Sequence, residues 1–283
     1  MPELPEVQTT VNGLNKTVRG RTILDVWTDY KSDFHTGKDN IKNPKFFKIF
    51  KKEILGTKIL KAERRGKNIL ISLDSGKTIL AHMKMTGFFF YNPPTDERFV
   101  RVKFYLDNKK VLAFSDMRKF AKITLIETKE REKDSELSHL GPDALDITIE
   151  KFKKVLSKEK RPIKQMLMDQ SLLTGVGNIY SDESLWLSCI HPRSTPNKIP
   201  NKQAELLLEA IKKVLKTGID FGGDSMSDYR NIYGEKGKFQ NKHNAYRKTG
   251  DKCSRKNCKG VITRDVVATR SAHFCSIHQK LFK

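Results

Sequence analysis

The first residues of the chain combine an imino acid with a carboxylate. Met1 precedes Pro2 and Glu3, and a small second residue normally permits removal of the initiator methionine. Removal would leave the ring nitrogen of Pro2 as a secondary amine, and a free α-amino group has a pKa of about 7.7–8.0. A useful fraction is therefore neutral near physiological pH and could attack an aldehyde-like carbon to form an iminium. Glu3 places a carboxyl beside that amine, where a general acid or base is needed.

The same residues also permit a simpler interpretation, in which they only begin a helix. Pro5 and Glu6 continue the pattern, and proline in a first turn and acids near the positive end of a helix are ordinary features of helix starts. The sequence of this segment alone leaves both interpretations open.

Four potential metal ligands gather near the C-terminus in the pattern Cys253-x4-Cys258-x16-Cys275-x2-His278. Two close pairs of soft ligands, separated by enough chain for a hairpin, can close a tetrahedral zinc site. Four protein ligands leave no open coordination position, so we expect one structural zinc ion per chain, and a zinc hydrolase is disfavoured. The alternative is a set of scattered, unligated thiols like the isolated Cys189, but clustered cysteines in an intracellular chain favour metal binding.

Three further segments carry groups suited to anions or nucleic acid. The glycine-rich stretch from Leu172 to Asn178 precedes a predicted helix, which Asn178 could cap, and exposed N–H groups at a helix start bind phosphate. The others are Arg64–Lys67 with His82–Gly87, and Asp116–Phe120. Met85 and Phe120 could fill the space left by a base that leaves the stack, and Arg118 could hydrogen-bond the orphaned base. Ordinary core packing is the alternative for Met85 and Phe120.

Composition narrows the class of protein. The 283 residues suggest two domains, and 55 Lys and Arg against 33 Asp and Glu give a net charge of +22. Such an excess favours a polyanionic partner, above all nucleic acid, although a lysine-rich proteome is an alternative. No apolar run approaches the roughly 18 residues of a membrane span, and the polar start lacks a signal peptide. We expect an intracellular monomer that does not engage membranes: in the cytoplasm or nucleoid of a bacterium, or the nucleus or an organelle of a eukaryote.

The pattern of elements changes along the chain. Helical spacing over Pro5–Lys16 gives way to short β-type runs between Thr22 and Ile126, separated by turns, which is typical of a sandwich or barrel. The charged stretch Glu127–Glu136 reads as an exposed connection. Helical segments are then predicted over the ranges 149–156, 162–169, 178–187 and 201–217, the last ending at Gly218. Short β-type runs flank the cysteine cluster at 260–262 and 273–275.

Together these segments resemble the formamidopyrimidine-DNA glycosylase and endonuclease VIII family, in family order and over nearly the whole chain. The matching residues are Pro2–Val7, Arg65–Gly66–Lys67, His82 with Met85–Thr86–Gly87, Asp116, Arg118 and Phe120, Leu140–Gly141–Pro142, Asp169–Gln170, Gly175, Gly177–Tyr180, Asp182–Glu183, Phe239–Gln240, and the cysteine hairpin with Arg270–Ser271.

The resemblance implies an α+β, multidomain chain. Its expected parts are an N-terminal catalytic β-sandwich domain with an N-terminal helix over 1–130, a linker over 131–147, a helix–two-turn–helix DNA-binding domain over 148–240 and a zinc-finger β-hairpin over 241–283. Damaged double-stranded DNA would lie in the cleft between the domains.

The resemblance also implies an activity and roles. The chain would be a base-excision-repair glycosylase and AP lyase that removes formamidopyrimidines and 8-oxoguanine and cleaves the strand by β,δ-elimination. Pro2 would be the nucleophile at the sugar C1′ and Glu3 the general acid or base, with Lys67 beside them in the catalytic machinery. The phosphates around the flipped nucleotide would be held by Lys67, His82, Asn178 and Arg270, and Met85, Arg118 and Phe120 would fill the gap.

Departures from the family pattern keep alternatives open. His278 stands where cysteine is common among the zinc ligands, and the first cysteine pair is spaced more widely. Ser227 stands in the presumed base-covering loop where arginine is frequent, which favours formamidopyrimidines over 8-oxoguanine as substrates. An endonuclease VIII-like enzyme for oxidised pyrimidines and a non-catalytic protein that binds damaged DNA are the competing functions. Arg118 and Phe120 on a loop separate from Met85 argue against the first, and Pro2, Glu3 and Lys67 against the second.

Overall fold

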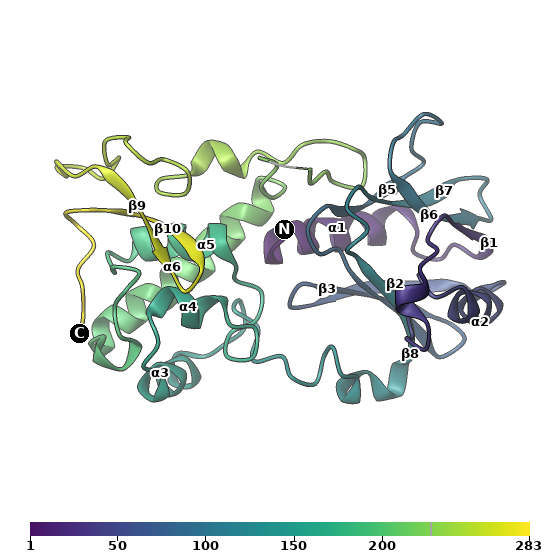
Figure 1. The fold of residues 1–283 in the computed structure, drawn as a ribbon, viewed down its shortest axis with the longest axis horizontal. Coiled ribbons are helices and arrows are strands. Elements are labelled where there is room, and N and C mark those ends of the chain that lie inside the picture. The colour runs from purple at the N-terminus through teal and green to yellow at the C-terminus, as the bar shows by residue number, and fades with distance from the viewer. Residues whose placement is uncertain (227) are drawn as a thin grey trace. The chain divides into compact units, whose positions relative to one another are not determined.

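The computed structural model of the protein describes residues 1–226 and 228–283, so the expectation attached to Ser227 lies outside the described residues. These residues fold into two compact units. The first comprises Met1–Ser138 together with Phe221–Lys238, and the second His139–Asp220 with Phe239–Lys283. Within the described residues, no helix is both long and apolar enough to span a membrane. The chain path is drawn in Figure 1.

The first unit contains the predicted β-sandwich. Two antiparallel sheets of four strands each are found among its described residues. The strand order is β1-β6-β7-β5 in one sheet and β2-β3-β4-β8 in the other. The strands are β1 Ile23–Thr28, β2 Ile59–Arg65, β3 Asn68–Leu73, β4 Lys77–His82, β5 Gly87–Tyr91, β6 Val100–Leu106, β7 Val111–Asp116 and β8 Lys122–Glu127.

Helix α1, Leu4–Thr17, packs its apolar face against this sandwich. Val7, Val11 and Leu14 recur at helical spacing and are buried in the same hydrophobic core as the strands. Asn15 joins the helix to edge strand β2: its Nδ2 donates to the carbonyl oxygen of Ala62 at 2.9 Å, and its Oδ1 accepts from the Ala62 N–H at 2.8 Å. The side-chain amide thus takes the place of a neighbouring strand at this point.

One α-helix of the first unit is absent from the sequence prediction, which gave only β-type runs between Thr22 and Ile126. Helix α2, Pro44–Ile54, begins after Asn43, whose side chain accepts a hydrogen bond from the Lys45 N–H at 3.1 Å. Its Phe50 and Ile54 are buried in the core. Strand β5 lies within the predicted range of β-type runs, although its three phenylalanines lack the alternation that identifies a half-buried strand.

The charged stretch predicted as an exposed connection contains a 3-10 helix, Thr128–Lys133. It is bound to the first unit by ion pairs between Arg131 and Glu63 at 3.2 Å and between Lys122 and Glu136 at 2.8 Å.

The second unit is helical and ends in a β-hairpin, as predicted. Its helices are α3 Ile149–Lys158, α4 Ile163–Met168, α5 Asn178–Leu187 and α6 Asn201–Asp220, and its strands are β9 Ile262–Val267 and β10 Arg270–Cys275. The prediction that Gly218 ends the last helix is wrong, since α6 continues past it to Asp220 and buries Gly218. A glycine inside a helix costs only about 1 kcal/mol relative to alanine, which the packing of a long amphipathic helix offsets.

The Asn15 contact gives a test of this packing. Asn15→Ala leaves the N–H and carbonyl of Ala62 without these partners, and we expect a loss of about 1–3 kcal/mol in the free energy of unfolding. Asn12→Ala on the same helix is the matched control, because Asn12 is exposed, and its effect should stay within about 0.5 kcal/mol. Denaturant titration followed by circular dichroism measures both. Equal losses in the two variants would contradict the role given to Asn15.

Candidate active site and metal centre

The N-terminus of helix α1 is held by a reciprocal capping arrangement. Glu3 is the N-cap and accepts from a backbone N–H of the first turn, while Glu6 Oε2 accepts from the Glu3 N–H at 2.7 Å. Pro2 and Glu3 are buried, whereas Met1 is 46% exposed and therefore accessible for removal. The two interpretations of this segment are thus compatible, because the devices that begin the helix also hold Pro2 and Glu3 in place.

Part of the segment after α6 returns to the first turn of α1, within the first unit. Glu6 Oε1 accepts from the Asp224 N–H at 2.7 Å, and the Tyr229 hydroxyl donates to the Glu6 carbonyl at 3.0 Å. Gly223, at φ +85°, has no room for a side chain, because a Cβ there would lie 2.9 Å from Glu6 Cγ. Sequence reasoning treated Glu6 only as a helix-start acid; its second partner lies more than 200 residues away in the chain and left no local signal.

Lys67 and His82 lie at one end of the sheet that contains β3 and β4. Lys67 is buried and follows the β2–β3 turn at Gly66, and the next residue, Asn68, pairs with His82 across the two strands. Burial, then the charges of Lys84 and Lys67, lowers the pKa of His82 to about 3. His82 Nδ1 accepts from the Lys84 N–H at 3.0 Å. The imidazole is therefore neutral with its hydrogen on Nε2, a donor suited to an anion.

Asp116 organises the loop that carries Arg118 and Phe120. Its fully buried carboxylate accepts from the Thr86 hydroxyl at 2.6 Å, the Tyr30 hydroxyl at 3.0 Å and the Ala121 N–H at 2.9 Å. The Arg118 N–H in turn donates to Thr86 Oγ1 at 3.1 Å. This chain of hydrogen bonds ties the β7–β8 loop to the residue that follows Met85.

The apolar residues proposed to fill a vacated base position are not core residues. Met85 is 40% exposed and Phe120 is 52% exposed, whereas the nearby Met83 is buried. The guanidinium of Arg118 lies over the Phe120 ring, 4.6 Å from its centroid. Their exposure excludes core packing as the role of Met85 and Phe120. Met85 and Arg118 lie on two different loops, which the hydrogen bond between Asp116 and Thr86 connects.

In the second unit, the glycine-rich stretch forms an ordered loop before α5. Gln170 closes it, donating to the Val176 carbonyl and accepting from the Gly175 N–H, both at 2.9 Å. The expectation that Asn178 caps the helix is wrong: Gly177 is the N-cap, and Asn178 is the first helical residue. Asn178 Oδ1 is buried and has no hydrogen-bond partner among the described residues. Its side chain is thus not used to begin the helix.

Two consecutive acids on α5 bind the elements around it. Asp182 pairs with the fully buried Lys164 of α4 at 2.5 Å, and its other oxygen accepts from the His273 N–H of β10 at 3.0 Å. Lys164 Nζ also donates to the carbonyl of Asn178 at 3.4 Å. Glu183 accepts the N–H groups of residues 244, 245 and 246 at 2.8–2.9 Å. Sequence reasoning missed Lys164, although a lysine among apolar helix residues is a signal for a buried ion pair.

The four predicted metal ligands converge. One ligand atom from each of Cys253, Cys258, Cys275 and His278 lies within 4.8 Å of all the others. The N–H of Gly260 donates to Cys258 Sγ at 3.4 Å. A Cβ at Gly260 would lie 2.4 Å from Cys275 Sγ, so only glycine leaves room for the cluster. Three sulfurs and one imidazole nitrogen at this separation suit a tetrahedral metal ion.

Arg270 stands at the tip of the same hairpin. Ala268 and Thr269 connect β9 to β10 with φ of +47° and +67°, the left-handed conformation of a tight two-residue hairpin turn. Arg270 follows this turn and is exposed. Its predicted contact with phosphate, like the other predicted roles, stays a prediction at this point.

Comparisons with known proteins agree with this arrangement. The family model of the formamidopyrimidine-DNA glycosylase N-terminal domain matches residues 1–123, and that of the formamidopyrimidine-DNA glycosylase H2TH domain matches residues 140–230. The chain is 35% identical to a formamidopyrimidine-DNA glycosylase of Ligilactobacillus salivarius over 97% of each protein. It is 38% identical to one of Herpetosiphon aurantiacus over 99% of this chain and 100% of the relative.

Solved structures give the same result. A complex of Lactococcus lactis Fpg with DNA containing an abasic site is similar to this chain, with a TM-score of 0.87, 30% identity, and coverage of 98% of this chain and 99% of that one. A complex of the wild-type Lactococcus lactis protein with DNA containing N7-benzyl-Fapy-dG has a TM-score of 0.87 and 31% identity, covering 99% and 100% of the two chains. The chain belongs to the formamidopyrimidine-DNA glycosylase family.

Proposed function

We propose that this protein is a DNA glycosylase and AP lyase that removes oxidised purines from double-stranded DNA with Pro2 as its nucleophile. The observation that carries the proposal is the buried Pro2–Glu3 pair at the capped start of α1. Once Met1 is removed, the Pro2 nitrogen attacks the sugar C1′ of the damaged nucleotide. The glycosidic bond to the base breaks, and the sugar ring then opens at its C1′–O4′ bond to leave an iminium at C1′. The iminium permits β,δ-elimination, which expels the two flanking phosphates and so cleaves the strand.

Glu3 acts in this scheme as general acid or base. Its carboxyl is on the residue next to the nucleophile, and its position is fixed by the same contacts that begin the helix. A group that transfers protons must lie within hydrogen-bond reach of the reacting atoms. The capping arrangement supports this role because it removes the freedom of both residues before substrate arrives.

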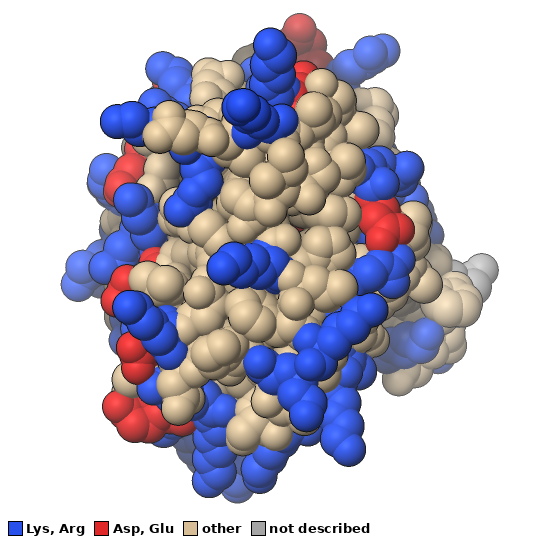
Figure 2. Space-filling model, turned by 90° about the vertical axis from the view of Figure 1, so that its left-hand side faces the viewer, with Lys and Arg blue, Asp and Glu red and all other residues tan. Residues whose placement is uncertain are grey.

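The remaining predicted residues hold the DNA. Lys67 and the neutral His82 supply donors to phosphate from one end of a sheet, and Asn178 and Arg270 supply them from the second unit. Lys and Arg clearly predominate over acids on the face shown in Figure 2, in keeping with the net charge of +22. Met85, Arg118 and Phe120 are exposed, as groups that fill a vacated base position must be.

The Cys253, Cys258, Cys275 and His278 cluster holds one structural zinc ion in this proposal. With four protein ligands, the ion supplies folding energy to a hairpin too small for a large core of its own. The first unit carries the catalytic residues and part of the DNA contacts, and the second, with its zinc finger, supplies the other DNA contacts.

A free Pro2 nitrogen is the first requirement to test. Protein that retains Met1 or an N-terminal tag should lose borohydride-trapped covalent product while still binding damaged DNA, because an iminium needs an amine and the phosphate contacts lie elsewhere. Mass spectrometry verifies the N-terminus, and a gel measures trapping on oligonucleotides with a formamidopyrimidine, 8-oxoguanine, an oxidised pyrimidine or an abasic site. Full trapping by verified tagged protein would exclude Pro2. A preference for the oxidised pyrimidine would favour the endonuclease VIII-like alternative.

Glu3→Gln separates proton transfer from helix capping. A glutamine can still accept the capping N–H, so the fold and DNA binding should be retained. Base excision should fall by about 100-fold or more, in line with the loss of a positioned acid or base. Cleavage of a pre-formed abasic site should fall less, since its aldehyde needs no base removal. Single-turnover kinetics on both substrates provide the comparison, and equal losses would contradict a role for Glu3 in base release.

Two substitutions in the zinc finger separate the role of Arg270 in DNA binding from the role of the zinc ion in folding. Arg270→Ala should retain one zinc ion per chain and weaken DNA binding, with the slope of log affinity against log salt reduced in magnitude by about 0.9. Cys275→Ser should lose both zinc and DNA binding while the β-rich unit stays folded. Metal analysis, circular dichroism and binding titrations over a salt series measure these effects. Unchanged DNA affinity in Arg270→Ala would contradict the role of Arg270 in binding phosphate.

A further inference from the structure

His278, the one ligand of the cluster that is not a cysteine, is contacted in two ways by Trp186. His278 Nε2 lies 3.1 Å from the Trp186 carbonyl oxygen. A carbonyl can only accept, so Nε2 carries the hydrogen and Nδ1 keeps a lone pair for a metal ion. That Nδ1 lies 3.4 Å from Cys253 Sγ and 3.7 Å from Cys258 Sγ. The indole also meets the imidazole edge to face, with centroids 5.4 Å apart and planes at 90°.

The indole N–H of Trp186 is a buried donor beside the same cluster. Trp186 is 7% exposed and packs in one apolar cluster with Cys253 and Cys275. Its Nε1 has no hydrogen-bond partner at ordinary distance among the described residues. A thiol accepts hydrogen bonds weakly, whereas a metal-bound thiolate is an anionic and better acceptor.

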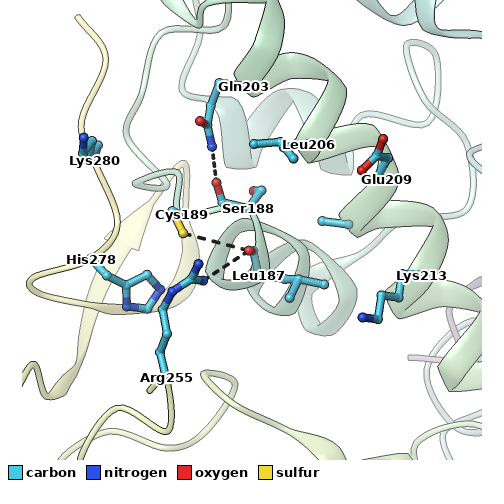
Figure 3. A pocket seen from close by; sticks show the side chains of 11 residues that line it. Leu187, Ser188, Cys189, Gln203, Leu206, Glu209, Lys213, Arg255, His278 and Lys280 are labelled. Carbon is cyan, nitrogen blue, oxygen red and sulfur yellow. Dashed lines mark hydrogen bonds between the residues drawn. The ribbon is translucent and has the colours of Figure 1, made fainter. Parts of the chain in front are cut away.

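His278 is also a ligand that solutes can reach. A pocket of about 500 Å³ in the second unit is lined by His278, Arg255 and Cys189, among others. Figure 3 shows the imidazole beside the Arg255 side chain at this pocket. Cys253 and Cys275 are buried, while His278 is half-buried. Contacts that stop the imidazole from turning out of the cluster therefore control access to the metal.

We propose that Trp186 is the positioning residue of the zinc site. Its carbonyl and ring hold His278 with Nδ1 toward the metal, and its indole N–H donates to one of the two thiolates of the loaded site that share its apolar cluster, Cys253 or Cys275. This inference rests on the proposed zinc ion and concerns metal retention rather than base excision. An orphaned buried N–H costs free energy, so the loaded site is the state in which Trp186 is satisfied.

Two substitutions separate the parts of this role in the full-length protein. Trp186→Phe keeps an aromatic ring and the backbone carbonyl but removes the N–H, and Trp186→Leu removes the aromatic ring as well. Trp27→Phe is the control, because Trp27 lies in the first unit on strand β1 and is partly exposed. The readouts are the rate of zinc transfer to a chromophoric chelator and the absorption spectrum of the Co²⁺-substituted protein.

Zinc release should be about 10-fold faster in Trp186→Phe than in the parent, and faster again in Trp186→Leu, while Trp27→Phe is unchanged. The thiolate-to-Co²⁺ charge-transfer band should move to longer wavelength in Trp186→Phe, because loss of a hydrogen bond raises the energy of the sulfur electrons. In a His278→Cys background, the difference between Trp186→Phe and Trp186→Leu should shrink, since the imidazole contact of the ring is already gone.

The outcomes distinguish the role of Trp186 from the proposal that the cluster holds a zinc ion. A parent protein that binds no zinc overturns both. A zinc-loaded parent whose Trp186→Phe variant has the same release rate and the same Co²⁺ spectrum overturns the role of Trp186 alone. A packing role without the hydrogen bond would speed release in Trp186→Leu but leave the Trp186→Phe spectrum in place. If the Trp186→Leu variant fails to fold, the conservative Trp186→Phe variant still tests the role of the Trp186 N–H.

Discussion

The arrangement of the first unit around its candidate nucleophile depends on the reciprocal hydrogen bonds between Glu3 and Glu6. A helix begins with N–H groups that have no partner within the helix, and each of these two acids accepts from one N–H at the helix start. The same bonds fix Glu3 immediately before the helix, which begins at Leu4, and with it the preceding residue Pro2. Because Glu6 also accepts from Asp224, the start of α1 is connected to the returning segment after α6. A local capping device therefore becomes the anchor for a loop distant in sequence.

Buried carboxylates fix two of the segments that carry predicted DNA contacts, and a third buried carboxylate orders a further loop of the second unit. Asp116 fixes the loop of Arg118 and Phe120, Asp182 holds the hairpin of Arg270, and Glu183 gathers three successive backbone N–H groups. Loops lack the hydrogen-bond ladder of helices and strands, so their backbone groups need other partners. In a chain with a charge of +22, such acids also offset part of the repulsion among cations. The buried carboxylates of Asp116, Asp182 and Glu183 thus order loops of a protein whose net charge is positive.

The zinc-finger hairpin is held in place by contacts other than buried carboxylates alone. Its apolar cluster is small and includes Trp186 of α5 and two of the four predicted metal ligands, Cys253 and Cys275. A hairpin of this size cannot bury enough apolar surface to fix its own position. Ligand convergence and contacts with α5 therefore replace a core. The Trp186 carbonyl accepts from His278 Nε2, which leaves Nδ1 facing the sulfurs of Cys253 and Cys258.

The sequence by itself determined the family and much of the architecture. Local signals were sufficient for α1, for most strands, for the helices of the second unit and for the metal ligands, because capping residues, periodicity and ligand spacing act over a few residues. Helix α2 carried such signals in Asn43 and Pro44, but it lay within a run of β-type segments. Strand β5 had none, since Phe88–Phe90 are apolar without alternation.

Only the tertiary structure decided which distant groups meet. It separated the buried Met83 from the exposed Met85, gave the N-cap of α5 to Gly177 instead of Asn178, and revealed the partners of Glu6, Lys164 and Trp186. These contacts join residues between 18 and 218 positions apart in the chain. Local patterns cannot specify them, because burial and hydrogen-bond partners across such separations are set by how whole elements pack.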